Sequence, residues 1–265
     1  MRAIDEAGSH QNHPQKKQGI VYIQLKINHK YGWQELFYVI EDKYFELKED
    51  KKLHYLHSGK GKLKILLLHG GDKHYQNAEH WREMIPWMAK LGEVFAFDLL
   101  GHGKSVPGEK HPEKVSGVEQ VQILSKFAEK IKNESDNNAI FLWVGRSYGG
   151  YILLSILNKN PQLINAMVLI APAIYPSQLE KLQNDSLEIP IMLFWAEDDP
   201  IIPWYKHKKI IETFKHVRFI RVGKVLERGM EKWMAHTPEL VKKGLFKKEF
   251  MSFVEEDILK KEKNN

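Results

Sequence analysis

The chain has 265 residues, of which 43% are hydrophobic and 28% charged, with a formal net charge of +6 and no cysteine. This length fits one α/β domain with a substantial core, and the interleaved lysines and glutamates are typical of a solvated surface. The lack of cysteine excludes disulfides, thiolate metal sites and cysteine nucleophiles. The densest basic stretch, Lys206 to Lys232, has no nucleic-acid-binding motif beside it, so nucleic acid is not an expected partner.

The ends of the chain indicate where the folded part lies. Residues 1–17 are polar and lack the apolar segment of a signal peptide, and no run approaches the roughly 18 apolar residues that a membrane span needs. We therefore expect a soluble, cytoplasmic protein without a membrane span. It should comprise a disordered or extended arm at 1–17, a single domain at 18–254 and a charged tail at 255–265.

The first elements are expected to pair as an antiparallel hairpin. Residues 20–27 and 34–40 predict two strands joined around Asn28 to Gly32, and residues 53–57 predict a third. From residue 64 the chain alternates apolar runs with segments of helical spacing, which predicts a mostly parallel sheet covered by helices on both faces, an α/β fold. The further strands are expected at 64–68, 94–97, 139–144, 166–170, 191–195 and 217–222, and the helices at 78–91, 118–131, 151–157, 177–182, 204–214 and 238–253.

Ser147 lies where an apolar strand is predicted to turn sharply into a helix. It is the centre of Gly145-Arg146-Ser147-Tyr148-Gly149-Gly150. Glycines two residues before and two after the serine remove side chains that would clash in such a turn. The turn lifts the hydroxyl above the sheet and directs the following backbone N–H groups at whatever the serine attacks. The alternative is a tight turn that serves only the packing of helix on strand.

Three motifs in this order resemble the α/β-hydrolase family, from about Ile20 to Phe253. His69-Gly70-Gly71 is similar to its oxyanion loop, Asp98-Leu99-Leu100-Gly101-His102-Gly103-Lys104-Ser105 to its D-x-x-G-x-G-x-S turn, and the serine segment to its nucleophile elbow. The resemblance implies the α/β-hydrolase fold and makes Ser147 the nucleophile. It also implies that the backbone N–H groups of Gly71 and Tyr148 form the oxyanion hole.

The same resemblance suggests the other members of a catalytic triad. Trp195-Ala196-Glu197-Asp198-Asp199-Pro200-Ile201-Ile202-Pro203 is similar to the segment that carries the acid, and its alignment selects Asp199, with Asp198 as the alternative. The base departs from the family pattern, because the position seven residues before Pro238 is Glu231 and the nearest histidine is His236. Either the loop from Gly223 folds so that His236 reaches Ser147, or the triad is incomplete; Glu231 is a weaker alternative base.

The remaining polar residues receive structural interpretations. His69 and His102 lie in turns of the family pattern, and Asp98 is expected to tie the turn after its strand. His54, His57, His74, His80 and His111 show no metal-ligand spacing, and no glycine-rich nucleotide motif follows a strand, so neither a metal nor a cofactor is expected. The tryptophans Trp81, Trp87, Trp143 and Trp195 are expected in the core or in pocket walls.

The expected activity is that of a serine carboxylesterase acting through an acyl-enzyme. The segment 173–188 is too short for a multi-helix lid, which favours an open site for small acyl esters, and Tyr75, Tyr148, Tyr175, Trp81 and Ile201 are candidates to line it. A related acyltransferase or cofactor-free peroxidase uses the same residues. The contrasting hypothesis is a catalytically impaired α/β-hydrolase-fold protein that serves as a structural or interaction subunit with a protein partner. The displaced histidine, the basic stretch and the polar N-terminal arm motivate it.

Overall fold

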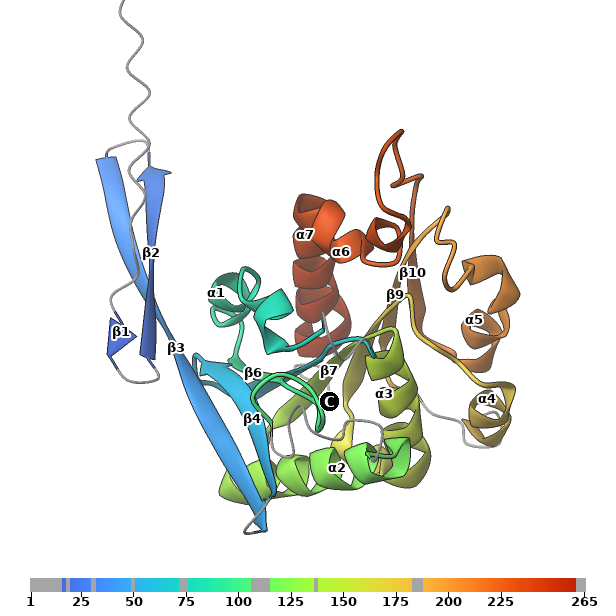
Figure 1. Cartoon of the computed structure of the whole chain (residues 1–265), viewed down its shortest axis with the longest axis horizontal. Helices are drawn as coiled ribbons and strands as arrows, with labels where there is room; N and C mark the ends of the chain where they lie inside the picture. The colour runs from blue at the N-terminus through green and yellow to red at the C-terminus, as the bar shows by residue number, and fades with distance from the viewer. Residues whose placement is uncertain are drawn as a thin grey trace, which may run out of the picture.

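The computed structural model describes residues 16–17, 20–29, 32–48, 51–71, 76–105, 115–135, 138–182 and 188–260. In this part of the chain the backbone forms one ten-stranded sheet in the order β1-β2-β3-β4-β6-β5-β7-β8-β9-β10 (Figure 1). The strands are β1 Lys16–Lys17, β2 Ile20–His29, β3 Gly32–Lys48, β4 Lys51–Ser58, β5 Leu63–Leu68, β6 Glu93–Phe97, β7 Ile140–Arg146, β8 Ala166–Ile170, β9 Ile191–Ala196 and β10 Val217–Val222.

The sheet is antiparallel at its N-terminal side and parallel beyond β6, which confirms the predicted fold class. Strands β1 to β4 pair antiparallel in succession, and β4 pairs antiparallel with β6. All pairs from β6 to β10 are parallel. The β2–β3 hairpin projects away from the rest of the molecule (Figure 1). The short strand β1 lies inside the segment 1–17 that was predicted as an arm.

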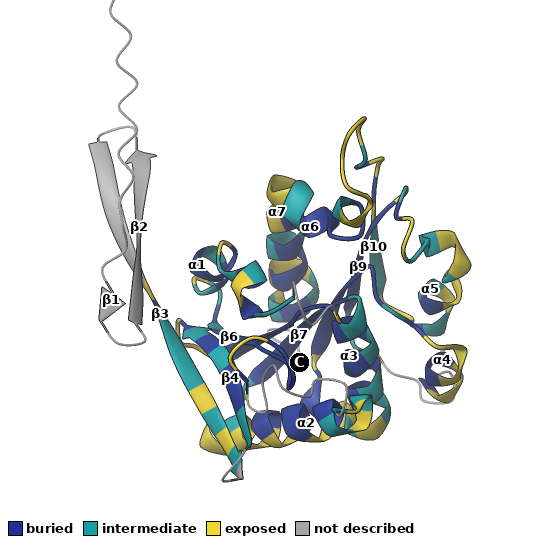
Figure 2. Ribbon diagram, viewed as in Figure 1, coloured by how far each residue is buried: buried dark blue, intermediate teal, exposed yellow. Residues whose placement is uncertain are grey.

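The core lies on both faces of the sheet because successive side chains of each strand point to opposite faces. In β5, Leu66 and Leu68 belong to one buried cluster, whereas Ile65 and Leu67 belong to the other. The same alternation in the neighbouring strands sends Trp143 to the first cluster. Helices α2, α3 and α5 cover the first face, and α1 and α7 cover the second. The strands between them are accordingly the most buried elements (Figure 2).

Most helices lie where the spacing predicts them, but three are interrupted. The helix predicted at 204–214 is divided at His207, whose φ of −120° and ψ of 21° leave the helical region. The observed α-helices are α1 Ile85–Met88, α2 Gly117–Glu134, α3 Tyr148–Lys159, α4 Pro176–Leu182, α5 Lys209–Thr213, α6 Pro238–Val241 and α7 Lys243–Phe253; short 3₁₀ segments are η1 Ala78–Trp81, η3 Pro161–Leu163, η4 Trp204–Lys206 and η5 Lys232–Met234, and a π-helical turn, η6 Val254–Leu259, continues α7.

The helix predicted at 78–91 is instead η1 followed by α1. Pro86 has no N–H to donate to the preceding turn, which opposes one continuous helix, whereas the Ala78 N–H at the start of η1 is capped by Asp98 Oδ1 at 2.6 Å. The helix predicted at 238–253 breaks at Lys242, whose φ of −105° and ψ of 48° leave the helical region.

The parallel strands bring the unusual residues of the chain to one edge. The carboxyl ends of β5, β6, β7 and β9 are followed by His69, Asp98, Ser147 and Asp199, respectively. Ligand sites in open α/β sheets lie at this edge. No helix in the described ranges combines the length and the apolar character that a membrane span requires.

Candidate functional site

Ser147 adopts a strained backbone conformation between β7 and α3. Its φ is 51° and its ψ is −115°, values that a residue with a side chain rarely adopts. A Cβ added to Gly145 would lie 2.7 Å from the backbone of Gly149, and one added to Gly149 would lie 2.7 Å from the carbonyl oxygen of Leu68. These contacts confirm that the two glycines are required by the tightness of the turn.

The backbone around Ser147 is held by hydrogen bonds on both sides. Its N–H donates to the Ile170 carbonyl at 2.9 Å. Its own carbonyl accepts from the N–H groups of Gly150 and Ala173, each at 2.9 Å. A strained residue persists only where its surroundings fix it in this way, and such strain is common at functional sites.

The oxyanion-loop candidate, Gly70 and Gly71, packs directly on the start of α3. A Cβ added to Gly71 would lie 3.0 Å from Tyr148 Cβ, so Gly71 packs against the Tyr148 side chain close to where it leaves the backbone. Two imidazoles contact the carbonyl groups of this loop. His69 Nδ1 bonds the Gly70 carbonyl at 2.6 Å, and His102 Nε2 lies 3.4 Å from the Gly71 carbonyl.

His69 is neutral in the folded protein. Burial, together with the nearby His102, lowers the pKa of His69 to about 3. Its ring nitrogens agree with one tautomer, because Nε2 accepts from the Leu99 N–H at 3.0 Å and Nδ1 is therefore left to donate to Gly70. The structural interpretation of this histidine is confirmed.

Asp98 ties together the turn after β6, as predicted. Its carboxylate accepts from the Ala78 N–H at 2.6 Å, from the Lys104 N–H at 2.7 Å and from His54 Nδ1 at 2.7 Å. Burial alone would raise the pKa of Asp98, but these three hydrogen bonds outweigh it and hold the pKa below its usual value. Asp98 therefore acts as an ionised anchor for the segment that contains residues 76–78.

Asp199 is fixed in the loop after β9 by three donors. Its Oδ1 accepts from the N–H groups of Ile201 and Ile202 at 2.9 and 3.1 Å, and Trp195 Nε1 lies 3.3 Å from Oδ2. The neighbouring Asp198 turns elsewhere, accepting from the N–H groups of Val225 and Leu226 at 2.8–3.1 Å. The two adjacent carboxylates therefore hold different segments.

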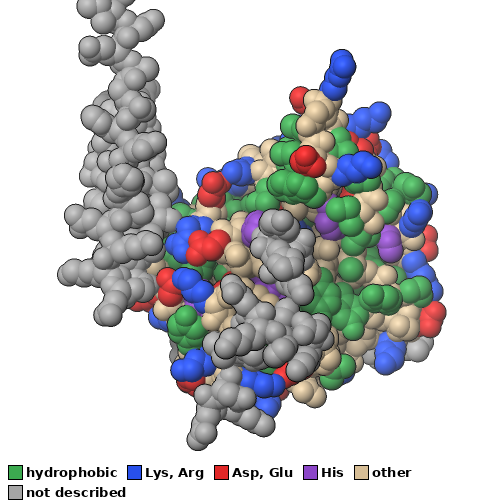
Figure 3. Space-filling model, viewed as in Figure 1, with side chains coloured by type: hydrophobic (Ala, Val, Ile, Leu, Met, Phe, Trp, Pro, Cys, Tyr) green, Lys and Arg blue, Asp and Glu red, His purple; other side chains and the backbone are tan. Residues whose placement is uncertain are grey.

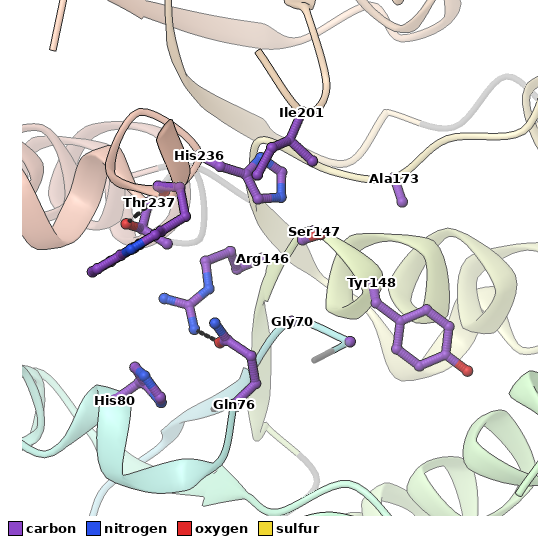
Figure 4. Close-up of a pocket in the computed structure, with 12 residues that line it drawn as sticks. Gly70, Gln76, His80, Arg146, Ser147, Tyr148, Ala173, Ile201, His236 and Thr237 are labelled. Carbon is purple, nitrogen blue, oxygen red and sulfur yellow. Dashed lines mark hydrogen bonds between the residues drawn. The ribbon is translucent and has the colours of Figure 1, made fainter. Parts of the chain in front are cut away.

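His236 reaches the site by the folding of the loop after β10. Its Nδ1 lies 2.8 Å from Asp199 Oδ2, and its ring is turned toward Ser147 (Figure 4). The turn between η5 and α6 supplies this position, since the His236 N–H donates to the Trp233 carbonyl at 3.0 Å. Glu231 is exposed at the start of η5 and does not line the cavity with Ser147. The structure therefore brings together Ser147, Asp199 and His236.

A cavity of about 810 Å³ lies over Ser147 and His236. Its other lining residues are Gly70, Gly71, Gln76, His80, Arg146, Tyr148, Ala173, Ile201, Trp233 and Thr237. Ile201 and Trp233 are about half exposed and form part of its rim, at 54% and 51% exposure. On this face of the molecule hydrophobic side chains gather centrally, whereas most Lys and Arg side chains lie toward the edge (Figure 3).

The candidate pocket residues do not all meet in this cavity. Tyr148 and Ile201 line it, but Tyr75 lies outside the described residues. Tyr175 lines a separate hollow of about 400 Å³ with Tyr148 and Tyr151. Tyr148 therefore separates the two spaces. In the described part of the chain no cluster of three or more histidines and carboxylates is placed to hold a metal ion.

Sequence reasoning missed the residues that line the cavity beside η1. Arg146 is almost fully buried and pairs with the fully buried Glu239, with Nη1 and Oε1 2.7 Å apart. Gln76 and His80 lie next to it (Figure 4). The Pro238-Glu239 pair was visible in the sequence, but nothing in the sequence connects Glu239 to a residue of the serine turn.

Known proteins resemble this chain in sequence and in fold. The family model for the serine aminopeptidase S33 family matches residues 59–184, which include Ser147 but neither Asp199 nor His236. The structure resembles a CIB-like hydrolase from Thermoplasma acidophilum, with a TM-score of 0.67, 16% identity, and coverage of 82% of this chain and 98% of that one. A serine hydrolase of carbazole degradation has a TM-score of 0.64 at 18% identity, covering 82% and 99% of the two chains.

The chain belongs to the α/β-hydrolase superfamily. Two similar sequences within the superfamily have described reactions. A 2-hydroxy-6-oxo-6-(2'-aminophenyl)hexa-2,4-dienoic acid hydrolase of Metapseudomonas resinovorans is 32% identical over 45% of this chain and 38% of its own length. A pimeloyl-[acyl-carrier protein] methyl ester esterase of Edwardsiella ictaluri is 26% identical over 43% of this chain and 38% of its own length. Each alignment thus spans about two fifths of the relative.

Proposed function

We propose that this α/β-hydrolase-fold protein is a serine hydrolase that cleaves small carboxylic esters through an acyl-enzyme. The observation that carries the proposal is the 2.8 Å contact between His236 Nδ1 and Asp199 Oδ2, made where the same imidazole lines the cavity with Ser147. A serine hydroxyl needs such a base, and the base needs a third group to orient it.

In the proposed reaction, Ser147 Oγ attacks the ester carbonyl while His236 Nε2 takes the hydroxyl proton. Asp199 accepts the Nδ1–H and stabilises the imidazolium. The imidazolium then protonates the departing alcohol as the tetrahedral intermediate collapses to the acyl-enzyme. A water molecule, deprotonated by the same imidazole, releases the acid and restores Ser147.

The negative oxygen of the intermediate would be held by the backbone N–H groups of Gly71 and Tyr148. Gly71 packs against the Tyr148 side chain, and Tyr148 is the first residue of α3, where helix N–H groups have no partner within the helix. Loss of one such donor costs about 3–4 kcal/mol of transition-state stabilisation. His69 and His102 support this role because they bond or approach the carbonyls of the same loop.

A small ester fits the rim of the cavity. Only the short α4 lies among the described residues between β8 and β9, and Ile201 and Trp233 remain half exposed. The similarity to a methyl ester esterase points to the same bond type. An acyltransferase would use the same residues, with an alcohol in place of water.

One of the three features behind the scaffold hypothesis was the displaced histidine. Asp198 fastens the loop at Val225 and Leu226, and the chain then returns to set His236 against Asp199. This arrangement favours catalysis over a purely structural role.

A fluorophosphonate probe tests the proposal. Its phosphorus is attacked by an activated serine and fluoride leaves, so mass spectrometry should find the adduct on Ser147. The adduct should be absent in Ser147→Ala and should form at least about a hundredfold more slowly in His236→Ala. Folded wild-type protein that remains unlabelled would overturn the proposal.

A further inference from the structure

The cavity over Ser147 has two chemically different ends. Ala173 and Ile201 line it on one side of Ser147 (Figure 4). On the other side of Ser147 stand three nitrogen-bearing side chains, Gln76, His80 and Arg146, here called the Gln76 subsite (Figure 4).

Arg146 orients its neighbours in this subsite, and its positive charge is already paired. Its Nη1 donates to Glu239 Oε1 at 2.7 Å, both side chains are almost completely buried, and the guanidinium lies 5.5 Å from the centre of the Trp81 ring. The charges of the pair cancel. One guanidinium is balanced by one carboxylate, so the pair holds no surplus of positive charge.

The same guanidinium fixes the orientation of Gln76. Arg146 Nη2 donates to Gln76 Oε1, so the amide oxygen is engaged and the amide NH₂ must face another direction. In the described part of the chain, the hydrogen bond that the Gln76 side chain makes is the one that Oε1 accepts from Arg146. A pre-oriented amide donor is therefore left at the wall of the cavity.

This donor lies beside the nucleophile. A Cβ added to Gly70 would be 3.5 Å from Gln76 Cδ and 3.5 Å from Ser147 Cβ, so both side chains border the same point. The backbone two residues after Gln76 is fixed as well, because the Ala78 N–H donates to Asp98 at 2.6 Å. The amide can thus reach a group a few bonds away from a carbonyl that Ser147 attacks.

His80 adds polarity without charge. Its burial, together with the neighbouring Arg146, lowers its pKa, so the imidazole is neutral at neutral pH. The Gln76 subsite thus offers N–H donors in an environment with no net charge.

We propose that the Gln76 subsite binds an uncharged oxygen acceptor of the substrate, a ketone or amide carbonyl, through Gln76 Nε2. The inference rests on the proposed function, because the acceptor belongs to the ester attacked by Ser147. A carboxylate is disfavoured, since the charge of Arg146 is already balanced by Glu239 and an unbalanced buried anion is costly. A methyl group in the same place would leave the amide donor unpaired.

Matched esters test the subsite. On the acyl side, the fourth carbon carries a ketone in ethyl 4-oxopentanoate, a methyl branch in ethyl 4-methylpentanoate and a carboxylate in monoethyl succinate. On the alcohol side, acetonyl acetate has a ketone where isobutyl acetate has a methyl branch. The kcat/KM for each ester is divided by the rate constant of its alkaline hydrolysis, which corrects for differences in the intrinsic reactivity of the esters. Wild-type protein should favour the ketone over the methyl ester by about tenfold or more in at least one pair, and monoethyl succinate should be the poorest acyl substrate.

Gln76→Leu should bring the ketone preference close to one, because kcat/KM falls more for the ketone than for the methyl ester, a split that general loosening of the fold would not produce. Gln76→Glu should lower the preference further, because it puts an acceptor in place of the donor. Gln162→Leu, the same change on the exposed segment η3, is the control and should keep the wild-type preference.

The possible failures are distinguishable. If Ser147 is labelled by fluorophosphonate but wild-type protein shows no ketone preference in either pair, or Gln76→Leu retains it, the subsite proposal is overturned and the hydrolase proposal stands. If Ser147 is not labelled and no ester is hydrolysed, both are overturned.

Discussion

His236 Nδ1 lies 2.8 Å from Asp199 Oδ2, whereas the adjacent carboxylate of Asp198 binds the backbone N–H groups of Val225 and Leu226. Two neighbouring acidic residues thus divide two tasks. One orients the imidazole, and the other anchors the loop that delivers it. The division makes the two aspartates a matched pair for mutagenesis.

Asp199→Asn should lower kcat for a small ester by about 10³–10⁴, because the amide no longer stabilises the imidazolium or selects its tautomer. Asp198→Asn, the same chemical change one residue earlier, should retain kcat within about tenfold and lower the melting temperature. Steady-state kinetics and thermal unfolding of the two variants check this. Equal losses of kcat would contradict the assignment of Asp199.

Gly149→Ala should destabilise the protein by about 1–3 kcal/mol, because the new Cβ would lie 2.7 Å from the Leu68 carbonyl oxygen, which belongs to a buried strand. Gly244→Ala is the control. It adds a methyl group to α7 where no atom lies within 4 Å, and should stabilise by up to about 1 kcal/mol. Urea unfolding of both variants measures the two signs, and a neutral Gly149→Ala would show that the elbow relaxes.

Arg146→Met and Glu239→Leu should each destabilise the protein by about 3–5 kcal/mol, because each leaves one buried charge without its partner. The double variant should lose less than the sum of the two, since neither charge is then stranded. Chemical denaturation of the four proteins gives the coupling free energy. Strict additivity would mean that the two side chains do not stabilise one another.

Acidification should weaken the fold in part through His69. An unfolded histidine binds a proton near pH 6.5, whereas the folded residue does so only near pH 3. Between these values the unfolded state holds more protons, so stability is present above pH 6.5 and falls as the pH decreases, by up to about 1.4 kcal/mol per pH unit for this one group. His69→Asn should reduce the slope of unfolding free energy against pH between 6.5 and 4.5; urea unfolding that shows parallel slopes would contradict this.

The strands and the serine turn could be predicted because their signals are local. A run such as Ile65 to Leu68 must be buried on both faces, and the glycines around Ser147 report the tightness of the turn directly. Asp199 follows its strand at a short distance, so it too was found. The position of His236 is seen only in the structure, because it depends on how the loop after Val222 folds rather than on any local pattern.

The rest of the site could not be predicted because it depends on contacts between distant segments. Arg146 contacts Glu239 and Gln76 across 93 and 70 residues of sequence, and no periodicity records such pairings. The predicted continuous helix at 78–91 was wrong because Pro86 cannot donate to the preceding turn, so η1 and α1 form separately. Tyr175 was expected with Ser147, but it lines the adjoining hollow on the far side of Tyr148.

The ion pair between Arg146 and Glu239 also acts as a brace between the two halves of the candidate triad. Arg146 is the residue before Ser147, and Glu239 stands three residues after His236, so one buried contact ties together the segments that carry the serine and the histidine. The segment around His236 is thus fixed at two points, by this ion pair and by the bonds of Asp198 to Val225 and Leu226. Relatives with longer or shorter connections after the last strand could keep the same catalytic spacing wherever such a brace is present.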